Sequence, residues 1–434
     1  MAVATVISPV ADICRAAKRA ARELARVDAG VKDAALEAIA AALESRVEEI
    51  LEANERDMQA GIEAGLGDAL LDRLRLDASR VADIAGAVRR IAALADPVGE
   101  VIDGRRLPNG LDVRKVRVPL GVIAVVYEAR PNVTIDAAAL CLKSGNAIVL
   151  RGSSSAAHSN ATLAQIAAQA AVTAGLPDGC VSLVAGGGHE ELAELATQKE
   201  TVDLVIPRGG ESLKAALEAV ATVPVIYAAS GNCHVYVDAS ARLEQAGAIV
   251  MNAKTQRPGV CNAAETLLVH RDVAARFLPR ILSSLAGAGV LIRADERTRA
   301  LALESDGAIG QAVAGPVLQD ATEEDWATEY LALTIAVRVV DSVEEAIEHI
   351  GRYGSGHSEA IVTRDTAAAR AFQLGVDAAC VYVNASTRFT DGGEFGMGAE
   401  IGNSTQKLHA RGPIGLRELC TFKYLVEGDG HVRN

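Results

Sequence analysis

Aromatic residues are scarce in this 434-residue chain: they make up 3% of it, and there is a single Trp. A base-stacking surface for nucleic acid is therefore disfavoured. The formal charge of −13 also argues against nucleic acid or an anionic membrane as a partner, because such partners are bound by basic patches. No apolar run approaches the roughly 20 residues that cross a bilayer. The N-terminus has no basic segment before its apolar stretch, so a signal peptide is not expected.

Several motifs of common enzyme classes are missing as well. The sequence has no G-x-x-x-x-G-K-[ST], G-x-G-x-x-G, H-E-x-x-H, C-x-x-C or G-x-S-x-G pattern. A P-loop kinase, a protein metal site and an α/β-hydrolase are therefore not expected. The seven cysteines are odd in number and widely scattered. We expect them to be thiols of a cytoplasmic protein and not a disulfide framework.

The apolar pattern predicts an α/β protein of two or three domains. Amphipathic helices fill residues 10–94, and a charged hairpin with Asn109-Gly110 at its turn is expected over 98–120. Buried strands then alternate with helices, which predicts a doubly wound parallel sheet with helices on both faces. The expected strands of this sheet are 122–127, 147–150, 181–184, 202–206 and 223–227.

A second α/β segment follows, and the tail contains a short strand, 421–426, with no partner near it in the sequence. We expect a cofactor-binding domain (1–97 and 121–240), a catalytic domain (241–399), and an oligomerisation ribbon and tail (98–120 and 400–434). The predicted elements of the catalytic domain are a helix at 242–253, strands at 332–340, 360–363 and 380–383, and a helix at 343–353.

The strongest local signal for chemistry surrounds Cys261, in the run NAKTQRPGVCNAAET. Pro258 and Gly259 end the preceding helix, so Cys261 is expected on a turn before a strand. Lys254 and Arg257 are nearby cations that favour the thiolate, the reactive form of cysteine. The alternative for Cys261 is a small buried hydrophobe, and the other six cysteines are expected to be structural.

Two polar segments follow strands of the doubly wound sheet, where ligands bind. In EARPNVT the Asn132 amide has the chemistry to donate a hydrogen bond to an oxyanion, although a Pro or Asx turn is the stronger local interpretation. In RGSSS, Arg151, Gly152 and Ser153 suit a phosphate group, and a helix N-cap explains them equally well.

Long blocks of the chain resemble the aldehyde dehydrogenase superfamily in order, and one family within it closely: the gamma-glutamyl phosphate reductases, also called glutamate-5-semialdehyde dehydrogenases. The resemblance covers essentially the whole chain. Its blocks are VPLGVIAVVYEARPNVTIDAAALCLKSGNAIVLRGSS, DLVIPRGGESL, NCHVYVDASA, NAKTQRPGVCNAAETLLVH and TDGGEFGMGAEIGNSTQKLHARGPIGLRELCTFKYLV. The resemblance implies a Rossmann-type cofactor domain, an α/β catalytic domain and a small β oligomerisation ribbon. It also implies NADPH-dependent reduction of L-glutamyl 5-phosphate to L-glutamate 5-semialdehyde, the second step of proline biosynthesis.

The resemblance also implies roles for individual residues. Cys261 matches the catalytic thiol, and Asn132 lies where the superfamily has its oxyanion-hole Asn. The implied cofactor contacts are Arg151 at the adenosine ribose and phosphate, Pro207 and Gly209 at the pyrophosphate, and Glu329 at the nicotinamide ribose. The anionic substrate needs cations, for which Arg257 and Arg388 are candidates and Lys254 a weaker one; a surface salt bridge is the alternative for both arginines.

One departure from the superfamily is informative. Its hydrolytic members carry a general-base Glu in a block like ELGGK, where this chain has Ala228-Ala229-Ser230-Gly231-Asn232. Without that base, water is not activated to hydrolyse a thioester intermediate. The missing Glu therefore fits an enzyme whose acyl acceptor is phosphate or coenzyme A.

NADP is expected because no Asp or Glu soon follows the Arg151 strand end. The alternatives are a coenzyme-A-acylating aldehyde dehydrogenase, a non-catalytic relative of the fold, and a hydrolase that pairs Cys261 with His357. Expected partners are other copies of the chain, in a homo-oligomer formed through the ribbon and tail, and the upstream glutamate kinase.

Overall fold

The computed structural model describes residues 9–186, 188–227, 230–303 and 317–433. The chain divides into two compact units. Unit 1 comprises Met1–Ala228, Gly396–Gly402 and Ile414–Asn434, and unit 2 comprises Ala229–Phe395 and Asn403–Pro413. The division drawn from the sequence differs from this one, because it left residues 229–240 with the cofactor-binding domain and kept 400–434 in one piece.

The centre of unit 1 is a four-stranded parallel sheet with the order β5-β4-β3-β6. Every residue of β3 and β4 is buried, because helices cover both faces of the sheet. In chain order the arrangement is 3-2-1-4, so the doubly wound sheet is confirmed. Its strands are β3 (Val122–Tyr127), β4 (Ala147–Gly152), β5 (Val181–Leu183) and β6 (Leu204–Arg208). The strand expected at 223–227 is only a single bridge, between Val205 and Val225.

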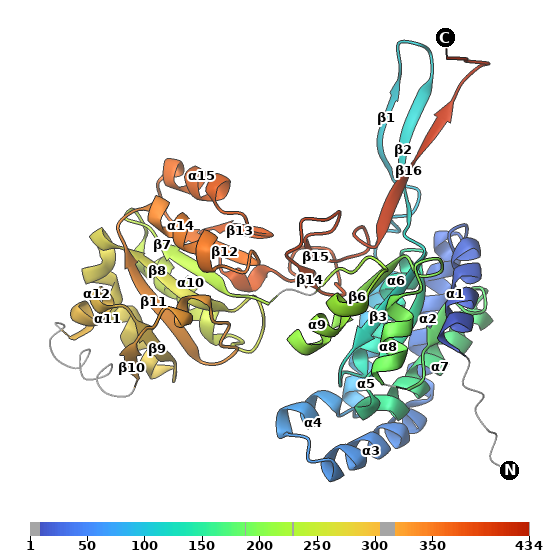
Figure 1. Cartoon of the computed structure of the whole chain (residues 1–434), viewed down its shortest axis with the longest axis horizontal. Helices are drawn as coiled ribbons and strands as arrows, with labels where there is room; N and C mark the ends of the chain where they lie inside the picture. Colours follow the sequence, from blue (N-terminus) through green and yellow to red (C-terminus); the bar gives the residue numbers. More distant parts are fainter. Residues whose placement is uncertain (1–8, 187, 228–229, 304–316, 434) are drawn as a thin grey trace. The chain divides into compact units, whose positions relative to one another are not determined.

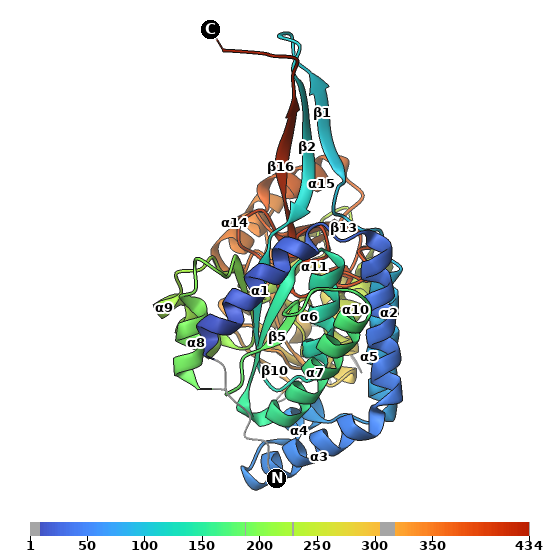
Figure 2. The ribbon, with the colours of Figure 1, turned by 90° about the vertical axis from the view of Figure 1, so that its right-hand side faces the viewer.

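Two helical layers enclose this sheet (Figure 2). One face carries α6 (Asn132–Lys143) and α7 (Ala157–Thr173), and the other carries α1 (Val10–Leu24) and α8 (His189–Ala196). The remaining helices of unit 1 are α2 (Ala29–Ser45), α3 (Val47–Glu63), α4 (Asp68–Leu74), α5 (Ala78–Ala92) and α9 (Glu211–Val220). Within the run of amphipathic helices expected over 10–94, α2 and α3 meet at Arg46. In the described part of the chain, no helix combines the length and apolar character that a membrane span requires.

A three-stranded antiparallel ribbon projects from the helical layers of unit 1 (Figures 1 and 2). It consists of β1 (Val101–Arg106), β2 (Asp112–Pro119) and β16 (Cys420–Glu427), in the order β1-β2-β16. The hairpin expected at Asn109-Gly110 is confirmed. The tail strand, for which the sequence offered no partner, pairs with β2 along its whole length. The two strands are about 300 residues apart in the sequence, and local sequence patterns do not predict pairing over such a distance.

Unit 2 is built on a seven-stranded parallel sheet with the order β10-β9-β11-β8-β7-β12-β13. Its strands are β7 (Cys233–Val237), β8 (Ala264–His270), β9 (Leu291–Ala294), β10 (Leu318–Asp320), β11 (Thr334–Val340), β12 (Ser358–Val362) and β13 (Cys380–Val383). A small antiparallel pair, β14 (Asn403–Ser404) with β15 (Gly412–Pro413), also belongs to this unit. The helices are α10 (Leu243–Thr255), α11 (Arg271–Gly287), α12 (Glu296–Leu303), α14 (Val343–Tyr353) and α15 (Thr366–Gly375).

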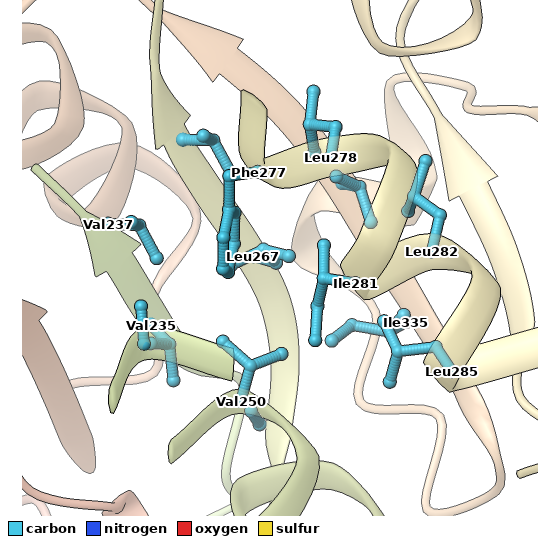
Figure 3. Close-up of a cluster of buried hydrophobic side chains, with 14 of the residues drawn as sticks. Val235, Val237, Val250, Leu267, Phe277, Leu278, Ile281, Leu282, Leu285 and Ile335 are labelled. Atoms are coloured by element: carbon cyan, nitrogen blue, oxygen red, sulfur yellow. The ribbon is translucent and has the colours of Figure 1, made fainter. Parts of the chain in front are cut away.

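The two faces of this sheet carry separate apolar cores. Val235 and Val237 of β7 point into the core under α10 and α11, and Tyr236 between them points into the core under α14 and α15. This alternation follows from the two-residue period of a strand. Figure 3 shows one face of α11, with Phe277 and Ile281 among its apolar side chains, directed at the strands.

Candidate active site

The residues expected to carry chemistry in unit 2 lie at the amino ends of its strands. Cys261 is on the turn between α10 and β8, as predicted. Because β11, β8, β7 and β12 are parallel neighbours, the segments that precede them meet at one edge of the sheet. Those segments contain Glu329 before β11, Cys261 before β8, Gly231 before β7 and His357 before β12. Six of the seven cysteines are buried, and Cys261 is the partly exposed one, which agrees with the structural role expected for the others.

Gly231 and Cys233 hold the backbone of Cys261 from one side. The thiol of Cys233 donates to the Cys261 carbonyl oxygen at 3.1 Å. A methyl group on Gly231 would overlap that carbonyl and lie 2.7 Å from the Cys261 Cα, so only glycine fits. Burial raises the pKa of Cys233 well above its ordinary value, which keeps this thiol protonated and able to donate. The Cys261 peptide is therefore fixed on a rigid support.

Glu329 lies on the same support. Its Oε1 atom accepts a hydrogen bond from the Gly231 backbone N–H at 2.6 Å. Close by, the Lys254 ammonium and the Glu265 carboxylate form an ion pair at 2.5 Å, and both side chains are fully buried. Burial lowers the pKa of Lys254 and raises that of Glu265 to about 7. Lys254, the weaker substrate candidate, thus already has a carboxylate partner inside the protein.

Two guanidinium groups accompany the thiol. Arg388 lies on the 3₁₀ turn Thr387–Phe389, and its Nε donates to Gln256 Oε1 at 2.7 Å. Burial and the charge of Arg257 lower the pKa of Arg388, whereas the charge of Cys261 raises it. Arg388 is therefore close enough to both Arg257 and Cys261 to be affected by their charges. A cation near a thiol stabilises its ionised form and attracts anions.

Asn262 connects the Arg388 segment to residues 256–263, the turn between α10 and β8 that carries Cys261. We call it the nucleophile turn, after the role predicted for Cys261. Its Nδ2 atom donates to the backbone carbonyls of Arg388 and Thr390, at 3.3 and 2.9 Å. The Thr387 hydroxyl donates back to the Asn262 carbonyl at 2.7 Å. These three bonds fix where Arg388 stands relative to the nucleophile turn.

His357 is fully buried beneath this edge of the sheet. Its Nδ1 atom lies 2.7 Å from the Ser358 hydroxyl and 3.8 Å from the Cys233 thiol. Burial lowers the pKa of His357 to about 4, so the ring is neutral near pH 7. These contacts favour a packing role and weaken the hydrolase alternative.

The candidate cofactor residues gather at the carboxyl ends of the unit 1 strands. Arg151 is the penultimate residue of β4 and is almost completely buried. Its guanidinium donates to the Gly188 carbonyl at 2.7 Å. The Arg151 Nε is buried and makes no hydrogen bond within the described residues. Ser153 bonds to the Ser155 hydroxyl at 2.6 Å. A methyl group at Gly152 would overlap the Asn160 amide, so that glycine is required by packing.

The point where the strand order reverses, between β3 and β6, holds the rest of this group. Pro207 lies within β6, and Gly209 directly follows the strand. Gly209 packs against the Glu128 carboxylate, because a Cβ added to Gly209 would lie only 2.8 Å from Glu128 Oε1. The Glu128 Oε1 also accepts the Gly210 backbone N–H, at 3.4 Å. Ligands of doubly wound sheets bind outside this reversal point. A buried arginine nitrogen without a partner, a serine pair and a glycine turn at one sheet edge fit a nicotinamide dinucleotide.

Asn132 begins α6 and is partly exposed. Its Nδ2 donates to Asp136 Oδ2 at 2.9 Å, one helical turn further on. Burial raises the pKa of Asp136 to about 6, although the Asn132 amide and the charge of Arg208 oppose the shift. The amide of Asn132 is therefore oriented by its own helix, and its oxyanion role stays a prediction.

Each unit thus collects its own set of the predicted residues. Unit 2 brings together Cys261, Arg257, Arg388, Lys254 and Glu329; unit 1 brings together Asn132, Arg151, Gly152, Ser153, Pro207 and Gly209. The sequence interpretation did not predict the contacts of four residues: Gly231 and Cys233 with the Cys261 backbone, Asn262 with the Arg388 segment, and Glu265 with Lys254. The only signal for Asn262 and Glu265 was their nearness to Cys261. Of the stretch that lacks the hydrolytic Glu, Ala228 and Ala229 lie outside the described residues.

The comparisons with known proteins agree with this geometry. Residues 7–300 match the model of the aldehyde dehydrogenase family. The gamma-glutamyl phosphate reductase of Moorella thermoacetica is 57% identical over 386 residues, which are 89% of each chain. That of Thermobifida fusca is 56% identical over the same length, again 89% of each chain. The crystal structure of gamma-glutamyl phosphate reductase from Thermotoga maritima superposes with a TM-score of 0.94 at 45% identity, covering 98% of this chain and 100% of that one.

An acetylating aldehyde dehydrogenase from Geobacillus thermoglucosidasius shares the fold, with a TM-score of 0.66 at 20% identity over 98% of this chain and 97% of that one. The chain belongs to the aldehyde dehydrogenase family and, within it, to the gamma-glutamyl phosphate reductases.

Proposed function

We propose that this oxidoreductase reduces L-glutamyl 5-phosphate to L-glutamate 5-semialdehyde and phosphate through a thioester on Cys261, with NADPH as the reductant. This is the second step in the synthesis of proline from glutamate. The observation that supports it best is the partly exposed thiol of Cys261 beside a cation: the next residue, Asn262, bonds to the backbone of the half-buried Arg388, and the charge of Cys261 acts on Arg388. The names of relatives at 50–57% identity support the substrate.

The covalent steps follow from that thiol. The Cys261 thiolate forms a C–S bond with the acyl carbon, and the C–O bond to phosphate breaks with its electron pair leaving on phosphate. A nicotinamide cofactor, when bound, supplies a hydride to the acyl carbon. Return of the C–S electron pair to sulfur then releases the aldehyde and regenerates the thiolate. Throughout, the Cys233 thiol and Gly231 keep the Cys261 backbone in one place.

Arg257 and Arg388 are the cations that we propose to bind the negative charges of the substrate. L-Glutamyl 5-phosphate carries a phosphate and an α-carboxylate, and a protein of charge −13 needs local cations to concentrate it. A guanidinium fork suits both anions. Because Lys254 is buried and paired with Glu265, we assign it to the support of the site and leave substrate binding to the two arginines.

The chemistry around the thiol also favours a stable thioester. Ser230, Gly231 and Asn232 replace the block that carries the water-activating Glu in hydrolytic relatives, and both Asn232 amide bonds go to backbone carbonyls, those of Trp326 and Tyr353. Two carboxylates near the turn have partners of their own: Glu265 pairs with Lys254, and Glu329 accepts the Gly231 backbone N–H. Turnover in the oxidative direction should therefore depend on phosphate.

The family implies a nicotinamide cofactor, and we propose NADP as the form used. Ser153 and Ser154 follow Arg151 where an acidic residue would repel a 2′-phosphate. Arg151 would contact the adenosine ribose and phosphate, Pro207 and Gly209 the pyrophosphate, and Glu329 the nicotinamide ribose.

The ribbon supports a homo-oligomer. All six residues of β1 and seven of the eight residues of β16 are exposed. They include Val101, Phe422 and Tyr424, at 55, 45 and 60% exposure, and such apolar surface is typical of an interface between subunits. We further propose that the enzyme works in the cytoplasm, where its cysteines stay reduced, and receives its labile substrate from glutamate kinase.

Replacement of Cys261 by Ser tests the function. The assay follows NADP reduction with glutamate 5-semialdehyde and phosphate. We expect C261S to lose at least about 10³-fold in kcat, because the nucleophile forms the intermediate. Retained turnover would remove the covalent mechanism. Wild-type turnover with coenzyme A in place of phosphate would instead identify the coenzyme-A-acylating alternative.

A further inference from the structure

A buried ion pair brackets the nucleophile turn. Lys254 lies at the end of α10, before the turn, and Glu265 lies in β8, after it. Neither side chain has any exposed surface. Two charges removed from water are expensive, and apolar residues of similar volume often stabilise a protein as well or better. The pair therefore needs an explanation other than stability.

The second carboxylate oxygen of Glu265 leads back toward the thiol. Glu265 Oε1 accepts the backbone N–H of Leu331 at 3.3 Å. Leu331 has φ 52°, a left-handed conformation that is unfavourable for a residue with a side chain. Surroundings must impose such a conformation, and Glu265 is one of the groups that do. The turn that holds Leu331 also carries Glu329.

Glu329 connects the Leu331 turn to Cys261 and so completes a path of contacts that begins at Lys254. It accepts the Gly231 N–H at 2.6 Å, and Gly231 lies against the Cys261 carbonyl. The contacts therefore run from Lys254 to Glu265, through the Leu331 turn to Glu329, and through Gly231 to Cys261. They start at Lys254, which precedes the turn, and end at Cys261 on the turn itself.

We propose that Lys254 and Glu265 are positioning residues for the reaction, which fix the turn carrying Glu329 and thereby the support on which Cys261 attacks. This inference rests on the proposed function, in which Cys261 is the nucleophile. The charge of Lys254 and its hydrogen bond favour the carboxylate form of Glu265, against the burial of this group and the neighbouring charge of Glu329, which favour the neutral form. As a carboxylate, Glu265 has an acceptor for the ammonium and another for the Leu331 N–H.

The test compares two double variants, K254M/E265Q and K254M/E265M. Both remove the two charges, and their side chains at residue 265 have nearly the same length. Only Gln offers an oxygen to the Leu331 N–H. We expect K254M/E265M to have a kcat lower than that of K254M/E265Q by about tenfold, as for a small misplacement of a reacting group. The KM for the semialdehyde should agree between the two within about twofold.

A second readout requires no turnover. The rate at which iodoacetamide alkylates Cys261, measured without cofactor and located by peptide mapping, reports on the support of the thiol. We expect this rate to differ between the two double variants by about threefold or more. Equal kcat and equal alkylation rates in two folded double variants would overturn the inference.

A second pair of variants tests the same contacts in case a double variant does not fold. If K254M/E265M does not fold, E329A and E329Q test the same path from its other end: only E329Q retains an oxygen for the Gly231 N–H. E329A must then change the alkylation rate of Cys261 relative to E329Q, and equal rates refute the path. Full activity of C261S would overturn the proposed function, whereas an inactive C261S with equal double variants overturns this inference alone.

Discussion

Gly231 offers the sharpest test of how the nucleophile is supported. It lies against the Cys261 peptide so closely that a methyl group would overlap the Cys261 carbonyl and come within 2.7 Å of the Cα. Gly231→Ala therefore forces either residue 231 or the nucleophile turn to move. The Glu329 carboxylate resists the first movement, because it holds the Gly231 N–H at 2.6 Å.

The size of the effect follows from that overlap. Ordinary contact with the carbonyl requires a shift of about one ångström or more, and a displacement of that size at a reacting group costs about 10²-fold in rate. The added methyl group also overpacks a tight site, which costs about 1–3 kcal/mol in unfolding free energy. We thus expect G231A to fold with a lower stability and to lose about 10²-fold in kcat.

The assay is NADP reduction by glutamate 5-semialdehyde and phosphate, with a urea titration on the same samples. Gly247→Ala is the matched control, because Gly247 lies within α10 in the same unit and has no atom within 4 Å of its Cβ position. We expect G247A to keep its kcat and to gain about 0.5–1 kcal/mol from helix propensity. A folded G231A with the kcat of the wild type would refute the argument.

Three further predictions concern substrate charge, the core and acid stability. Arg388→Gln should raise the KM for phosphate by about tenfold or more, with little change in the KM for NADP. The control Arg276→Gln, at an exposed position on α11, should change neither KM. An unchanged KM for phosphate in R388Q would contradict the proposal that Arg388 binds the substrate anion. Phe277→Ala, within the core under α11, should lower the unfolding free energy by about 3–5 kcal/mol, and a loss below 1 kcal/mol would mean that the core is not packed as described. His349 has its pKa lowered to about 3 by burial, so it binds a proton at higher pH in the unfolded chain, and stability is full above about pH 6.5 and falls as the pH drops toward 3. His349→Gln should reduce that slope by up to about 1.4 kcal/mol per pH unit, as measured by urea titrations between pH 4.5 and 6.5, and an unchanged slope would assign the acid lability elsewhere.

The sequence predicted the local elements better than the distant contacts. The helix Val343–Tyr353 and the strand Cys380–Val383 are found as expected, because their apolar period and end signals lie within the segment itself. The partner of β16 is β2, and strand pairing over that distance depends on the whole fold. The expected domain boundary differs from that of unit 2. The strand β7 resembles the strands of unit 1 in composition, and only its neighbours in the sheet assign it to unit 2.

The same distinction applies to the candidate site. Cys261 was predicted from its own turn and its nearby cations, and Arg257 and Arg388 were predicted from the charge expected of the substrate. The packing of Gly231 against Cys261 was not predicted, because it depends on a contact with a peptide 30 positions further along the chain. Lys254 was interpreted as a cation for the substrate, since nothing in the sequence shows that Glu265 pairs with it inside the protein.

The central claim is a thioester between the glutamyl group and Cys261. It is tested most directly by mixing the enzyme with glutamate 5-semialdehyde and NADP in phosphate-free buffer, quenching in acid, and mapping the peptides by mass spectrometry. The account predicts a glutamyl adduct on the peptide that contains Cys261, which disappears when phosphate is added before the quench. An adduct on another residue, or turnover with no adduct on any peptide, would contradict it.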